Sequence, residues 1–210
     1  MGDSAGDQGF QLIVGLGNPG KEYEETRHNI GFAVLEILAL RLNVNFSKES
    51  KWDAHLARYS SSPGSELALM KPTTFMNLSG EAVGKYARFH RIPPAAALIV
   101  SDDVSLPLGT LRLRREGGAG GQKGLKSVLM HFATEQVPRL RVGVGGAEGK
   151  DLSDHVLSRF LPEERTPAMN AISRAADALL CVLNQGMDHA MNLYNANTAP
   201  SIINTTTKLA

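Results

Sequence analysis

The sequence lacks the features that mark several special classes of protein. It holds one cysteine, Cys181, so no internal disulfide can staple the fold. No apolar run approaches the roughly 18 residues of a membrane-spanning helix. The 22 Lys and Arg residues nearly balance the 21 Asp and Glu residues, and the net charge of +1 excludes a histone-like basic protein. The chain has 210 residues, of which 42% are hydrophobic and 20% charged. This length and composition are typical of one globular domain.

The two ends of the chain carry little hydrophobic pattern. Residues 1–9 are rich in Gly, Asp and Ser and match neither a secretory signal nor an Arg-rich transit peptide, so we expect a disordered N-terminus. Residues 196–210 are polar, and we expect a flexible tail there and a single domain over residues 10–195. The lack of an export signal and of disulfides predicts a cytoplasmic protein, or an organelle protein if a targeting peptide has been removed.

Hydrophobic periodicity alternates between strand and helix along this domain. Short apolar runs predict strands over residues 10–16, 56–59, 67–70, 97–100, 110–114 and 140–144. Helical spacing, turn residues and a Thr166-Pro167 start signal predict helices over residues 30–42, 78–89, 125–132, 166–183 and 187–194. Because several strands are apolar throughout, the pattern predicts an α/β protein whose sheet is covered on both faces.

Residues 15–20 read G-L-G-N-P-G, which matches the G-x-G-x-x-G pattern of dinucleotide-binding proteins. That pattern holds a pyrophosphate only when a helix begins inside it, so that helix amides meet the phosphates. Here the polar stretch 21–29 follows, and the helical pattern resumes only at Ile30. We therefore expect no nucleotide cofactor, and the alternative is a glycine-rich turn that merely reverses the chain.

Polar side chains gather after three expected strands, in segments 18–29, 71–77 and 101–103. Ligands of open α/β sheets bind beyond the carboxyl ends of the strands, so these segments would meet at one edge. Together they offer His28, carboxylates and amides, a set that activates water. The alternative is that His28 lies on the surface or caps a helix, while the amides and carboxylates cap helices and turns. No G-x-S-x-G motif and no metal-ligand spacing of His and Cys is present, so we expect neither a serine nucleophile nor a metal.

The segment 109–141 is basic, although the whole chain is nearly neutral. It holds seven basic and two acidic residues, a charge of +5, which leaves −4 on the rest of the chain. Strand alternation puts Arg112 and Arg114 on one face, where they could clamp a phosphate. The glycine loop that follows, residues 117–124, offers backbone amides to an anion. The segment predicts an anionic partner, and the alternative is a solvated strand and helix surface.

Five motifs in order closely resemble the bacterial-type peptidyl-tRNA hydrolase family, over roughly residues 10–195. They lie at residues 12–32 (LIVGLGNPGKEYEETRHNIGF), 71–80 (KPTTFMNLSG), 101–114, 117–127 and 138–145. The resemblance implies a single-domain mixed twisted sheet with flanking helices, no cofactor or metal, and a monomer. It implies hydrolysis of the ester between a peptide and the 3′-terminal ribose of tRNA, so that peptidyl-tRNA is the expected partner.

The resemblance also implies roles for individual residues in the chemistry. His28 falls on the family's general base for water, and Asp102 on the acid that orients that histidine. Asn18 and Asn77 fall on the amides that position substrate and water. A carboxylate beside an imidazole favours the imidazolium that forms as water loses its proton, which makes the pairing chemically sensible.

Further positions fall on the family's substrate-binding residues. Tyr23 and Met76 match cleft residues near the peptide and the terminal nucleotide. Arg114 and Arg141 match a basic pair that grips the tRNA 5′-phosphate. Such a clamp makes physical sense, because that phosphate lies at a fixed distance from the acceptor end of every tRNA.

The glycine loop departs from the family pattern G-G-H-G-G-H-N-G-L. Ala119 and Gln122 replace its two histidines, and Lys123 replaces an asparagine that anchors water and substrate. An ammonium only donates hydrogen bonds, so Lys123 can hold a phosphate or a carbonyl but cannot accept from water. Ser101 also stands where a histidine usually precedes the acid. Two hypotheses follow: an active hydrolase with an altered substrate shell, or an RNA-binding relative with weak or no hydrolysis, such as an organelle intron-splicing cofactor.

Overall fold

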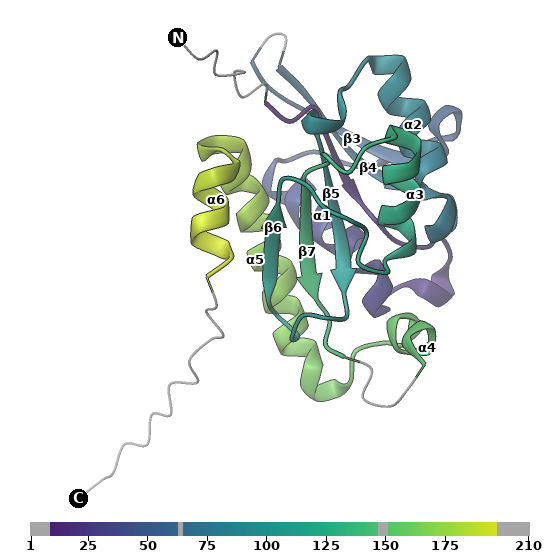
Figure 1. Cartoon of the computed structure of the whole chain (residues 1–210), viewed down its shortest axis with the longest axis vertical. Coiled ribbons are helices and arrows are strands. Elements are labelled where there is room, and N and C mark those ends of the chain that lie inside the picture. Colours follow the sequence, from purple (N-terminus) through teal and green to yellow (C-terminus); the bar gives the residue numbers. More distant parts are fainter. Residues whose placement is uncertain (1–8, 63–64, 147–150, 197–210) are drawn as a thin grey trace, which may run out of the picture.

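The protein is known from a computed structural model, which describes residues 9–62, 65–146 and 151–196 (Figure 1). Within these residues seven strands form one sheet in the order β2-β3-β4-β1-β5-β7-β6. The strands are β1 (Leu12–Gly15), β2 (Ser47–Glu49), β3 (Ala54–Ser62), β4 (Ser65–Pro72), β5 (Ala97–Asp103), β6 (Leu111–Arg114) and β7 (Arg139–Gly143). The central strands β4, β1, β5 and β7 run parallel, whereas β2, β3 and β6 run antiparallel to their neighbours. The predicted mixed sheet is therefore confirmed.

Helices cover both faces of the sheet, as the apolar strands predicted (Figure 1). One face carries α1 (Ile30–Arg41), α5 (Pro162–Gln185) and α6 (Met187–Tyr194), and the other carries α2 (Ser79–His90) and α3 (Lys123–Phe132). The short α4 (Leu152–Leu157) lies beyond the carboxyl ends of β5 and β7. Single turns of 3-10 helix occur at η1 (Lys21–Tyr23), η2 (Arg27–Asn29), η3 (Ser50–Trp52), η4 (Met76–Leu78) and η5 (Pro94–Ala96). No helix in the described ranges has the length and apolar composition needed to span a bilayer.

Strand alternation divides the hydrophobic core into two layers. Ile13 and Leu98 point toward α1 and α5, whereas Leu12 and Ile99 point toward α2 and α3. All four side chains are fully buried. Both faces of β1 and β5 therefore need apolar residues, which explains their unbroken hydrophobic runs.

A close approach of backbones places the start of α1 against the strand ends. A Cβ atom on Gly31 would lie 2.6 Å from the main-chain oxygens of Leu16 and Val100. Only glycine allows this contact, because every other residue would clash with both strands. The turn η2, which immediately precedes α1, is thereby held at the carboxyl edge of β1 and β5.

The strands predicted over residues 56–59 and 67–70 are longer than expected and span Ala54–Ser62 and Ser65–Pro72. Two other predicted boundaries were wrong, and each has a structural cause. Helix α5 begins at Pro162, four positions before the Thr166 start signal, because the Leu161 N–H donates to Oε2 of Glu164 at 2.7 Å and caps an earlier turn. Strand β5 continues to Asp103 and does not end at residue 100, because β7 pairs with it through Asp103. Neither α4 nor β2 was predicted. Residues 1–8 and 197–210, which contain nearly all of the two expected flexible ends, lie outside the described residues.

Candidate active site

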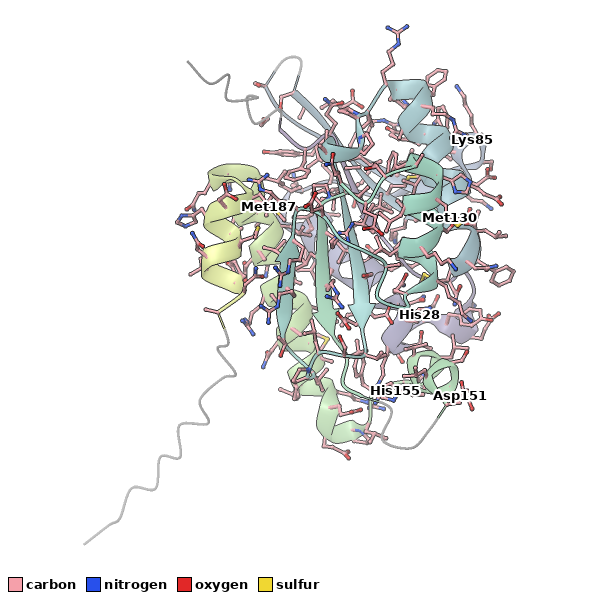
Figure 2. The ribbon with its side chains drawn as sticks, viewed as in Figure 1. His28, Lys85, Met130, Asp151, His155 and Met187 are labelled. Atoms are coloured by element: carbon pink, nitrogen blue, oxygen red, sulfur yellow. The ribbon has the colours of Figure 1, made fainter. Side chains whose placement is uncertain are left out.

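A cleft of about 890 Å³ opens at the carboxyl edge of the sheet. Its lining comes from the three predicted polar segments, from the glycine loop and from α4, so segments far apart in the sequence meet there. Figure 2 shows His28 at the same end of the molecule as Asp151 and His155, which lie at the start of α4 and within it. The position agrees with the rule that α/β proteins bind ligands beyond the carboxyl ends of their strands.

His28 and Asp102 form a hydrogen-bonded pair in this cleft. Nδ1 of His28, in η2, lies 2.9 Å from Oδ2 of Asp102, near the end of β5. The two residues are only 9% and 4% exposed. Because an ionised carboxylate can only accept, Nδ1 carries the hydrogen and Nε2 is left as the basic nitrogen. The arrangement stabilises positive charge on the imidazole when Nε2 takes a proton.

The second oxygen of Asp102 has a partner that the sequence did not predict. Nε2 of Gln122 donates to Oδ1 of Asp102 at 3.1 Å. The sequence singled out Gln122 only as a replaced family histidine and assigned it no role. Its contact arises because the glycine loop returns to the strand ends before α3 begins.

Asn18 joins the cleft to the segment that follows β4. Its Oδ1 accepts from the Met76 N–H at 2.8 Å, and its backbone exchanges two hydrogen bonds with the Asn29 side chain. With Oδ1 occupied, the side-chain NH2 of Asn18 is the group left to donate to a ligand. Asn77 is exposed and lines the same cleft, and Met76 is buried in its wall.

The remaining predicted site residues are divided between the cleft and its surroundings. Lys123 is exposed, lines the cleft and forms the first turn of α3. Tyr23 is half-buried in η1 and does not belong to the cleft lining in the described structure. The prediction for Tyr23 therefore lacks support from the cleft geometry.

Four arginines share one face of the antiparallel pair β6 and β7. The register places Arg112 opposite Arg141 and Arg114 opposite Arg139. The same-face neighbour directly across from Arg141 is thus Arg112, whereas Arg114 is its diagonal neighbour. Arg114 is exposed and Arg112 half-buried, so both present charge beside the cleft.

Two of these arginines are already engaged within the protein. Nη2 of Arg141 lies 2.5 Å from Oδ2 of Asp103. Arg139 is 2% exposed, and it donates to the carbonyls of Val137, Gly118, Glu135 and Gly117. Burial, with a smaller contribution from Arg141, lowers the pKa of Arg139 from its ordinary value. The guanidinium of Arg139 holds the glycine loop in place and is not free for an external anion.

Arg27, next to His28, anchors η2 to the segment after α4. Its buried guanidinium donates to Ser158 Oγ at 2.8 Å and to the Arg159 carbonyl, and it pairs with Glu164. The backbone N–H of Arg27 also donates to the Ser158 carbonyl at 3.0 Å. These bonds hold η2, the turn that carries His28, in place.

No group of three or more His, Cys, Asp or Glu side chains in the described residues could hold a metal ion. The class of the protein follows from the fold and the cleft together: an α/β protein with a histidine–carboxylate pair at the carboxyl edge of its sheet.

Comparison with known proteins identifies the family within that class. Residues 12–201 match the family model described as Peptidyl-tRNA hydrolase. The peptidyl-tRNA hydrolase of Geobacillus thermodenitrificans is 47% identical over 187 residues, 89% of this chain and 100% of the relative. That of Akkermansia muciniphila is 42% identical over 191 residues, 90% of this chain and 98% of the relative. A crystal structure of peptidyl-tRNA hydrolase from Acinetobacter baumannii gives a TM-score of 0.83 at 35% identity, covering 89% of this chain and 95% of that one. The chain belongs to the peptidyl-tRNA hydrolase family, as its motifs predicted.

Proposed function

We propose that this chain hydrolyses peptidyl-tRNA at the ester that joins the peptide to the 3′-terminal ribose. The observation that carries the proposal is the buried His28–Asp102 pair in the cleft of a chain that belongs to this family. The products are a free peptide carboxylate and a tRNA that can be charged again.

In the proposed mechanism His28 acts as general base and Asp102 orients it. Nε2 of His28 takes a proton from water, and the resulting hydroxide attacks the ester carbonyl. The tetrahedral intermediate collapses, its bond to the ribose oxygen breaks, and the imidazolium returns the proton to that oxygen. Water thus supplies the hydroxyl of the new acid and the hydrogen of the ribose hydroxyl. General-base assistance of this kind contributes about 10²–10⁴-fold.

The other cleft residues would bind and orient the substrate. The free NH2 of Asn18 and the amide of Asn77 would hold the peptide end and the water, with Met76 forming the apolar wall beneath them. Phe75 and the leucines of α4 line the same cleft and offer apolar surface to the peptide. Positioning the water and the ester together supplies most of the remaining rate enhancement.

The acceptor arm of the tRNA would lie over the arginine face of β6 and β7. Arg114 is exposed there and free to bind a phosphate, and Arg112 stands beside it. Arg141 would also contribute to phosphate binding. Because it is paired with the negative charge of Asp103, its net attraction for a phosphate is smaller than that of Arg114. Lys123 at the cleft mouth would bind a substrate phosphate or carbonyl.

We propose that the enzyme works as a monomer in the cytoplasm, without a metal or another cofactor. The monomer is what the resemblance to the peptidyl-tRNA hydrolase family implies. Support for the compartment comes from the proposed substrate, which arises where ribosomes translate.

A second function, RNA binding with weak or no hydrolysis, is favoured by one observation: Lys123 stands where the family carries an asparagine. The experiment that separates the two is cleavage of a defined peptidyl-tRNA by the purified protein, with His28→Ala and EDTA arms. Turnover by the wild type, unaffected by EDTA and lost in His28→Ala, supports the hydrolase. Tight tRNA binding without turnover would overturn it in favour of the RNA-binding relative.

A further inference from the structure

Gln122 connects three parts of the cleft through one amide group. Its Oε1 accepts from the Leu125 N–H at 2.6 Å and caps the N-terminus of α3. Its Nε2 donates to Oδ1 of Asp102 at 3.1 Å and lies 3.2 Å from the sulfur of Met76. Because the backbone N–H of Leu125 can only donate, the oxygen of the amide must face the helix. The NH2 group is then committed to Asp102.

The hydrogen bonds of Asp102 are divided between its two oxygens. Oδ2 faces His28, and within the described residues Gln122 is the side chain found on Oδ1. Asp102 is 4% exposed, so little water is available to replace a lost donor. Without Gln122, the carboxylate would be free to rotate about its Cβ–Cγ bond and to turn away from the imidazole.

We propose that Gln122 is a positioning residue for the hydrolysis, which holds the Asp102 carboxylate in the orientation that directs His28. The inference rests on the proposed function, because it assigns a role within that reaction. Gln122 touches neither water nor ester in this role and acts only through Asp102. The N-cap fixes the amide, the amide fixes the carboxylate, and the carboxylate fixes the imidazole.

The proposal differs from a purely structural role for Gln122 as a helix cap. A serine at this position keeps an acceptor for the start of α3 but is too short to reach Asp102. A methionine has nearly the length of glutamine but neither caps the helix nor donates. The control is Met130→Gly, which weakens α3 at a side chain that is 69% exposed and outside the cleft lining.

The first experiment measures kcat, KM and thermal unfolding of Gln122→Ser, Gln122→Met and Met130→Gly. Loss of a hydrogen bond to a charged group predicts a fall in kcat of about 10–100-fold in both Gln122 variants, with KM within about twofold. Met130→Gly should lower the unfolding temperature and leave kcat unchanged. Wild-type kcat in Gln122→Ser, or an equal loss in Met130→Gly, would reduce Gln122 to a helix cap and overturn the proposal.

The second experiment compares the NMR signal of the His28 Nδ1–H proton in the wild type and in Gln122→Ser, in the free protein. That proton lies in the hydrogen bond to Oδ2 of Asp102, so a carboxylate freed by the loss of Gln122 should shift or broaden the signal. The other titratable or charged side chains in the cleft lining are Asp103, Lys123, Arg141 and Asp151, all retained in this variant. A changed Nδ1–H signal in a protein that does not cleave peptidyl-tRNA would refute the hydrolase and keep the role of Gln122 in orienting Asp102. An unchanged signal and unchanged turnover in Gln122→Ser would refute the positioning role and keep the hydrolase.

Discussion

Nδ1 of His28 lies 2.9 Å from Oδ2 of Asp102, although 74 positions of sequence separate the two residues. The pair forms because Gly31 lets the start of α1 approach the end of β5, which brings η2 against the carboxyl end of that strand. Each residue is nearly buried, so the imidazole and the carboxylate interact with little screening by water.

Substitution of His28 is expected to separate turnover from binding. His28→Ala removes the only nitrogen base of the proposed pair, so kcat should fall by about 10²–10⁴-fold. The dissociation constant for tRNA should stay within about twofold, since the phosphates are bound elsewhere. Single-turnover cleavage and a filter-binding titration measure the two quantities. A large loss of tRNA affinity would show that His28 belongs to the RNA-binding surface instead.

Asp102→Asn tests the orientation of the imidazole. The asparagine NH2 can donate to Nδ1, which would move the ring proton to Nε2 and leave no base on the cleft side. We expect kcat to fall by about 10²-fold or more, by the loss of general-base assistance. The fold should persist, because asparagine has the same shape and can still accept from Gln122. Thermal unfolding close to that of the wild type, measured beside the activity, is the control.

Lys123→Asn restores the residue that the family usually carries. An asparagine can accept a hydrogen bond from water as well as donate one, which the ammonium of Lys123 cannot do. If water placement limits the reaction, kcat should rise, by roughly up to tenfold for one hydrogen bond. The measurement is kcat on a defined peptidyl-tRNA, with Lys126→Asn on the exposed side of the same helix as control. An unchanged kcat would mean that Lys123 does not limit the hydrolysis.

The arginine face predicts a salt-dependent affinity that Arg112 shares with Arg114. Arg114→Ala should weaken tRNA binding and reduce the slope of log affinity against log salt by about 1. Arg112→Ala should have a comparable effect, because Arg112 lies on the same face and directly opposite Arg141. Arg115→Ala is the matched control, since Arg115 is paired with Asp188. Equal slopes in all three variants would remove this face from the RNA-binding surface.

Arg27 and Arg41 form a matched pair for stability measurements. Arg27→Ala removes buried hydrogen bonds to Ser158 and Arg159 and the pairing with Glu164, so we expect a loss of about 2–3 kcal/mol in the free energy of unfolding. Arg41→Ala removes an exposed pair with Asp177 and two exposed hydrogen bonds to Ser173, and it should cost about 1 kcal/mol or less. Urea unfolding of both variants measures the difference. Equal costs would show that the Arg27 network adds little to stability.

Local pattern was enough to predict most of the sheet and the two-sided cover of helices. The runs in β1 and β5 are apolar because both faces of those strands are buried. Each residue of such a strand must be apolar, so the requirement can be recognised in the local sequence. The prediction for the start of α5 failed because two local start signals compete. Glu164 caps an earlier turn at Leu161 and is itself held by Arg27, so the helix starts at Pro162 and not at the Thr-Pro signal that follows.

The sequence by itself determined the family, most of the strands and helices, and the residue types of the cleft, because each depends on neighbours along the chain or on motif order. Only the tertiary structure decided which side chains meet. The arrangement of the strands brings Asp103 next to Arg141 and lets Arg139 donate hydrogen bonds to the glycine loop. The return of that loop to the strand ends brings Gln122 to Asp102. Such contacts depend on positions in space that no local pattern encodes, since one-residue shifts in a strand reverse the face of every side chain.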